Sequence, residues 1–161
     1  MDATFNHVLV ATDGSTRSDP AIELALRAAG GAPLTAVLVV CAYGLLEFAR
    51  ATFCEGGTID HLQEQLLTKG RDELDAALKR CCGPDHSPSI RPLVVLAEQA
   101  SCAILQTADR EGCDLIVMAS HGRGSLASVL LGSQTAKVLS QSRVPVLIAR
   151  AGPVITDGIQ A

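Results

Sequence analysis

Five short apolar runs, separated by stretches with helical periodicity, limit the architecture that this chain can adopt. The runs are HVLVA at 7–11, LTAVLVVC at 34–41, IRPLVVLA at 90–97, LIVMA at 115–119 and VPVLIA at 144–149. Runs that are apolar on both faces are typical of strands buried between two layers of helices. Strands that alternate with helices pair in parallel through right-handed crossovers. The sequence therefore predicts an α/β fold with an open, doubly wound, five-stranded parallel sheet.

The segments between these runs carry helix signals. Asp19 is expected to cap the first helix, with Pro20 in its first turn, and Gly30 is expected to end it. Residues 60–80 form the clearest amphipathic pattern, and Gly70 within it predicts close packing or a slight bend. The other expected features are helices at 101–110 and after Gly132, a loop or partly helical excursion at 42–57, and a turn at 83–89.

Composition argues against nucleic-acid partners and against a membrane span. Of 161 residues, 48% are apolar and only 2% are aromatic, so the chain lacks the aromatic platforms on which single-stranded nucleic acids stack. A net charge of -4 also argues against a polyanion binder, and we expect no nucleic-acid partner. No apolar run is long enough to span a membrane. The length fits one domain, at 1–150, followed by a short tail at 151–161 that is expected to fray.

The six cysteines form no C-x-x-C pair, and we expect no signal peptide. Free thiols in a reducing cytosol are therefore the expected state, which predicts a cytoplasmic protein. Cys81, Cys82 and His86 match no usual zinc spacing, so no metal site is predicted.

The segment Val117–Leu139 has the pattern of a phosphate site. A buried strand leads into a loop that contains Gly122, and a helix restarts at Gly132-Ser133. Glycines let backbone amides approach an anion, and the first amides of a helix supply donors. The alternative is a tight turn followed by a helix that Ser133 caps with nothing bound. The loop matches neither the P-loop nor the dinucleotide fingerprint.

Polar residues also follow the ends of other strands, where open parallel sheets bind ligands. Asp13 follows the first strand and could accept a hydrogen bond from a ribose hydroxyl, or it could make an Asx-turn with Gly14 and Ser15. Arg123 could contact a phosphate or be a solvated loop residue. His121 has no carboxylate or nucleophile near it in sequence, so we assign no catalytic residue.

Four segments resemble the universal stress protein family across Phe5–Arg150. They are HVLVATDGS, LTAVLVV, EGCDLIVMASHGRG and LLGSQTAKVLSQSRVPVLIAR. In nucleotide-binding members the signature is G-x-x-G, nine residues, then G-[ST]. Here the spacing is intact, but Ala119 replaces the first glycine. The resemblance implies a three-layer, Rossmann-like fold of the adenine nucleotide alpha hydrolase type, with strand order 3-2-1-4-5.

The resemblance also implies a stress-response regulator that binds ATP or AMP, with or without Mg²⁺, and needs no redox cofactor. Asp13 would take the ribose, the backbone at Val39 would read the adenine edge, and amides near Gly122 would hold the phosphates. The full set of implied nucleotide-binding residues is Ala11, Thr12, Asp13, Val39, Ala119, Gly122, Arg123, Gly132, Ser133 and Gln134. The family further implies a homodimer formed through the last strand, Val144–Ala149.

Two alternatives remain open at the level of sequence. Ala119 leaves room for a dimeric interaction protein of the same fold that binds no nucleotide. An ATP-consuming enzyme on a related fold is disfavoured, because residues 12–17 read TDGSTR where such enzymes carry S-G-G-x-D-S. We therefore expect a protein that is not an enzyme, with weak ATP hydrolysis still open.

Overall fold

The computed structural model describes residues 5–42, 44, 47, 52, 56–83, 89–120 and 131–150. Five parallel strands form one sheet in the order β3-β2-β1-β4-β5, which confirms the predicted topology. The strands are β1 (Val8–Thr12), β2 (Leu34–Cys41), β3 (Ile90–Ala97), β4 (Leu115–Ala119) and β5 (Val146–Ala149), and the helices are α1 (Asp19–Ala29), α3 (Gly56–Cys82), α4 (Ala100–Glu111) and α5 (Ser133–Gln141).

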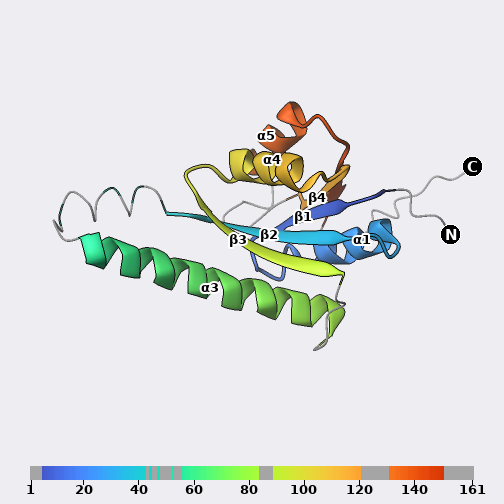
Figure 1. Ribbon diagram of the computed structural model, residues 1–161. Coiled ribbons are helices and arrows are strands. Elements are labelled where there is room, and N and C mark those ends of the chain that lie inside the picture. Colours follow the sequence, from blue (N-terminus) through green and yellow to red (C-terminus); the bar gives the residue numbers. More distant parts are fainter. Residues whose placement is uncertain are drawn as a thin grey trace, which may run out of the picture.

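Helices cover both faces of the sheet (Figure 1). One apolar core lies between the sheet and α1 with α3, and the other lies between the sheet and α4 with α5. Successive residues of a strand point to opposite faces. In β1, Val8 and Val10 therefore join the first core, while Leu9 and Ala11 join the second. Both faces of the three inner strands, β1, β2 and β4, are largely buried, which explains why these strands read as continuous apolar runs.

The long helix α3 begins at Gly56 rather than at residue 60 and ends at Cys82. At Gly70 an added Cβ would lie 2.8 Å from Val94 Cγ1 and 3.0 Å from Val40 Cγ2, so the expected close packing is confirmed.

Other boundaries differ by one or two residues. Ser18 occupies the N-cap position of the first helix without a side-chain capping hydrogen bond, and Asp19 is the first residue of the helix. Gly30, with φ +55°, ends this helix as predicted. The last strand starts at Val146, and Pro145 before it contributes only its carbonyl, which accepts a hydrogen bond from the Ile116 amide. Because proline has no N–H to donate to the ladder, its place just before the strand is expected.

Several sequence predictions fall partly outside the described residues. In the excursion at 42–57, the described positions 44, 47 and 52 have helical backbone. The turn at 83–89 is described only at its two ends, and the tail at 151–161 lies outside. Within the described part of the chain, no helix has the length and apolar character that crossing a membrane requires. The cysteines described there, at positions 41, 81, 82, 102 and 113, are free thiols, as expected.

Candidate functional site

The carboxyl ends of three neighbouring strands lie at one level. Thr12 of β1 pairs with Leu38 of β2, and Ala11 pairs with Met118 of β4. The residues that come next at this level are Asp13, Val39 and Ser120. From β1 the chain leads to β2 on one side, whereas β4 lies on the other side. The strand order therefore reverses at β1, and open α/β sheets bind ligands outside the strand ends at such a point.

Strand alternation separates these residues into two groups. Val39 packs in the core on the α4 and α5 side, as Ala11 and Met118 do. Continued one residue past β1 and β4, the same alternation assigns Asp13 and Ser120 to that side. Ala119 belongs to the opposite core, beneath α1 and α3, and is only 9% exposed.

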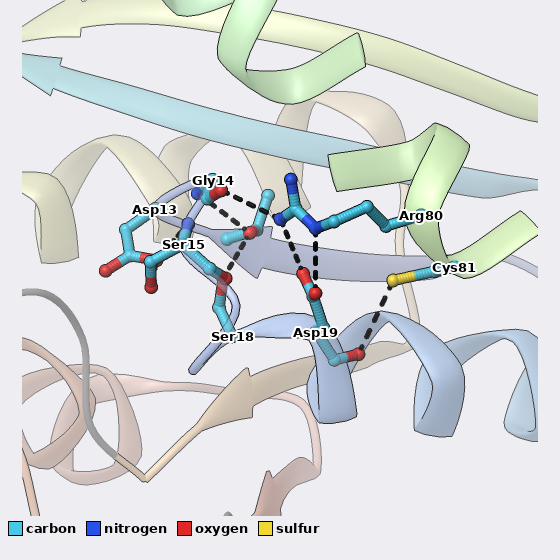
Figure 2. Close-up of polar contacts among 8 residues, drawn as sticks. Asp13, Gly14, Ser15, Ser18, Asp19, Arg80 and Cys81 are labelled. Atoms are coloured by element: carbon cyan, nitrogen blue, oxygen red, sulfur yellow. Dashed lines mark hydrogen bonds and ion pairs between the residues drawn. The ribbon is translucent and has the colours of Figure 1, made fainter. Parts of the chain in front are cut away.

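Asp13 is held in a local turn (Figure 2). Its Oδ1 accepts hydrogen bonds from the Ser15 amide at 3.0 Å and from Ser15 Oγ at 2.6 Å. The Asx-turn considered as one alternative for Asp13 is therefore present. An ionised carboxylate offers about four acceptor positions. The turn is thus compatible with a further hydrogen bond from a ligand.

Thr12 fixes the start of the same turn from inside the protein. Its buried hydroxyl accepts a hydrogen bond from the Gly14 amide at 3.1 Å and lies 2.7 Å from Ser18 Oγ. Ser18 Oγ in turn donates to the carbonyl of Ser15 at 2.8 Å. The Thr12 side chain therefore supports the turn from the α1 side of the sheet.

Arg80, in the last turn of α3, adds a contact that the sequence did not reveal (Figure 2). Its Nε and Nη2 donate to the two carboxylate oxygens of Asp19 at 2.9 and 2.8 Å, and Nη2 also donates to the Gly14 carbonyl at 3.0 Å. The hydrogen bonds to Asp19 raise the pKa of Arg80 above its usual value. Asp19 and Gly14 are 61 and 66 residues away from Arg80, so no local pattern indicates the contact.

The start of α5 is tied to the end of β4. The Gly132 amide donates to the Ser120 carbonyl at 2.7 Å, and Thr135 Oγ1 donates to the Ala119 carbonyl at 3.1 Å. Gly132, not Ser133, is the cap of this helix. The amide of Ser133 thus lies in the first turn, where amides have no intrahelical acceptor and can serve an anion.

Gln134 joins two helix starts. Its Oε1 accepts a hydrogen bond from the Ser101 amide at 3.0 Å, in the first turn of α4. This hydrogen bond engages only the carbonyl oxygen of the Gln134 side chain, and the backbone amide of Gln134 lies in the first turn of α5, where it could meet a phosphate. His121, Gly122 and Arg123 lie outside the described residues, so their predicted roles stay predictions.

A separate cavity of about 450 Å³ lies between the C-terminal ends of α4 and α5. Leu105, Ile116, Gln141 and Arg143 are among the residues that line it, and none of the predicted nucleotide-binding residues does. Cys113 also lines this cavity, and burial raises the pKa of its thiol to about 11. A thiol that is protonated at neutral pH is a poor nucleophile, so this cavity shows no sign of an activated cysteine.

Comparisons with known proteins identify the family of this chain. The universal stress protein family matches residues 4–150. A universal stress protein of Mycobacterium tuberculosis (strain ATCC 25618 / H37Rv) is 30% identical over 149 residues, which cover 89% of this chain and 43% of the relative. The chain spans 29% and 35% of the length of two other curated relatives, from Methanocaldococcus jannaschii and Thermus aquaticus.

Solved structures show the same fold. The universal stress protein UspA from Lactobacillus plantarum has a TM-score of 0.73 at 22% identity, and the likeness covers 92% of this chain and 100% of that one. A universal stress protein crystallised in complex with cAMP has a TM-score of 0.56 at 25% identity, covering 92% of this chain and 98% of that one. Because the family match at residues 4–150 includes all five strands of the sheet, this chain belongs to the universal stress protein family.

Proposed function

We propose that this protein binds an adenine nucleotide at the carboxyl ends of β1, β2 and β4. The observation that carries the proposal is the common level of Asp13, Val39 and Ser120, with Ser120 hydrogen-bonded to Gly132 at the start of α5. Strand alternation assigns all three residues to the α4 and α5 side of the sheet. An acidic side chain, a strand-end backbone and a helix start are complementary to a ribose, a base edge and a phosphate. The relative of 25% identity that was crystallised with cAMP supports the same class of ligand.

Each part of the nucleotide has a proposed partner. Asp13 accepts hydrogen bonds from the ribose hydroxyls, and the backbone of Val39 meets the adenine edge. The amides of Ser133 and Gln134, with Gly132, Gly122 and Arg123, hold the phosphates. Ala11 and Thr12 border the site through their backbone, because their side chains are buried in the protein.

The replacement of the family's first glycine by Ala119 is compatible with this proposal. The methyl group of Ala119 belongs to the core under α1 and α3, on the side of the sheet opposite Val39. A methyl group that packs there takes no space from a ligand on the α4 and α5 side. The alternative of a family member that binds no nucleotide therefore has little support from this position.

Calorimetry on protein stripped of nucleotide tests the proposal, with ATP, AMP and cAMP titrated in the presence and absence of Mg²⁺. We expect saturable binding of at least one of them, and no heat of binding at millimolar ligand would remove the proposal.

Gly132→Val should abolish binding, because a branched side chain would fill the phosphate space. Gly132 has φ -64° and ψ 148°, which valine adopts readily, so the change tests space rather than backbone strain. Ser140→Ala, on the exposed side of the same helix, is the matched control.

We also propose that two copies pair through the last strand, in the segment 144–149. β5 is at the edge of the sheet, and Leu147 on it is 38% exposed. An apolar edge strand with open backbone groups favours pairing with a second chain. Light scattering should give a dimer mass for the wild-type chain and a monomer mass for Leu147→Lys. A monomeric wild type would refute the pairing.

We further propose that the protein acts as a regulator by binding the nucleotide and does not catalyse a reaction on it. The site supplies a ribose acceptor and phosphate donors, but we assign no general base or metal carboxylate within it. A cytoplasmic location is also proposed, supported by the free thiols of the described cysteines. A Mg²⁺-dependent ATP turnover of order 1 s⁻¹, a usual enzyme rate, would replace this proposal with an enzymatic one.

A further inference from the structure

We propose that Arg80 is a positioning residue for the nucleotide: from the end of α3 it fixes the turn that orients Asp13. The inference rests on the proposed function, because Asp13 is taken as the ribose partner. Arg80 itself lies in the last turn of a helix that contributes none of the proposed ligand contacts. Its effect on a ligand would therefore pass entirely through the turn.

The Gly14 peptide is the part of the turn that Arg80 holds. Its N–H donates to Thr12 Oγ1 at 3.1 Å, and its carbonyl accepts from Arg80 Nη2 at 3.0 Å. Gly14 has φ +77°, a left-handed conformation that glycine reaches without strain but does not prefer over its alternatives. Contacts on both sides of the peptide select this one conformation, and Asp13 is the residue directly before it.

Arg80 is itself held in place by Asp19. The two planar groups meet through parallel hydrogen bonds of 2.8 and 2.9 Å, which fix the plane of the guanidinium as well as its position. Asp19 lies in the first turn of α1 and Arg80 in the last turn of α3, so each charge also interacts favourably with the dipole of its own helix. A lysine cannot make the parallel pair and still reach the Gly14 carbonyl in the same geometry.

Loss of Arg80 should leave the Gly14 carbonyl to water and let the turn sample other conformations. Apparent affinity falls in proportion to the fraction of molecules that keep the binding conformation, so a fall of that fraction to about 10–30% weakens binding roughly three- to tenfold. The change acts on the turn before any ligand arrives. Amide exchange without nucleotide should therefore report it directly.

The experiment compares Arg80→Gln with two matched controls. Lys79→Gln changes the neighbouring cation, which pairs with Asp75 on the same helix at 2.6 Å. Arg91→Gln removes another surface ion pair, between β3 and Glu111 of α4, and controls for a general loss of stability. The partners of the two control cations, Asp75 and Glu111, lie outside the turn at 13–15.

We expect Arg80→Gln to speed amide exchange at Gly14 and Ser15 in the nucleotide-free protein and to raise the Kd for AMP three- to tenfold. Arg80→Lys should give an intermediate result, and both controls should match the wild type in both measurements. Unchanged exchange in Arg80→Gln would overturn the inference, and so would faster exchange with an unchanged Kd. If wild-type protein binds none of ATP, AMP and cAMP, the proposed function fails, while the exchange data still decide whether Arg80 orders the turn.

Discussion

Replacing Ala119 with glycine, the residue that the family signature carries, should cost stability and leave nucleotide affinity unchanged. Ala119 is the last residue of β4, is 9% exposed and packs in the core under α1 and α3. Removing a buried methyl group costs about 0.8 kcal/mol. Glycine in a strand costs about another 0.5–1 kcal/mol in backbone entropy.

The two costs together amount to about 1.5 kcal/mol of unfolding free energy. For a domain of this size that corresponds to a fall in Tm of roughly 3–6 °C. The Kd for AMP should stay within about twofold, because the methyl group lies on the side of the sheet away from Val39.

Ala36→Gly is the matched control for this prediction. Ala36 lies in β2, is fully buried and packs in the same core, near the start of the strand and away from its carboxyl end. It should lose a similar amount of stability and bind AMP normally. A gain in affinity of tenfold or more in Ala119→Gly alone would refute the assignment of faces, since it would place the Ala119 methyl against the ligand.

Three further predictions concern packing, pH and thiol reactivity. Gly70→Ala should lower the free energy of unfolding measured in urea. A Cβ 2.8 Å from Val94 Cγ1 would cost about 1–3 kcal/mol in overpacking, whereas the gain in helix propensity is about 1 kcal/mol. Equal or greater stability of the variant would contradict the close packing at Gly70. Hydrogen bonds from the segment before β1 lower the pKa of Asp114. Its contribution to stability is therefore present above its unfolded pKa, near 4, and is lost as the pH falls through the folded value. Asp114→Asn should accordingly flatten the loss of stability below about pH 4, and an unchanged pH profile would count against this. Iodoacetamide at pH 7.5 should label exposed Cys102 well before buried Cys113, whose pKa is about 11; mass spectrometry showing equal rates would contradict the burial.

The strands could be predicted closely because each is a short apolar run, and in the inner strands β1, β2 and β4 burial on both faces requires such a run. The runs at 34–41, 90–97 and 115–119 match β2, β3 and β4 residue for residue. Each run is bounded by glycine, proline or a charged residue nearby, so a shift of its ends would bury a polar group or expose an apolar one. The strand order came from family resemblance, since periodicity alone does not rank the pairings.

Helix caps were predicted less well because a cap can be replaced by a contact from elsewhere in the chain. Asp19 has the right chemistry for a cap, but its carboxylate is engaged by Arg80 and Ser18 takes the cap position. Ser133 was similarly expected to cap α5, and Gly132 does so while its amide binds the Ser120 carbonyl. Arg80 and Ser120 are distant in sequence from the helix starts that they contact, so a local pattern contains no information about these contacts.

In the candidate site, too, features that depend on neighbouring residues could be predicted, and features that depend on distant contacts could not. The turn at Asp13 depends on a partner two residues away, so the sequence alone could offer it as one of two alternatives. Whether Ala119 obstructs a ligand depends on which face of the sheet it occupies, and that requires the register of β4 against β1. A one-residue slip would exchange the faces of Ala119 and Ser120. The observed register, with Ala11 opposite Met118, directs Ser120 rather than Ala119 toward the side of Val39, and this is why the departure from the family signature need not abolish binding.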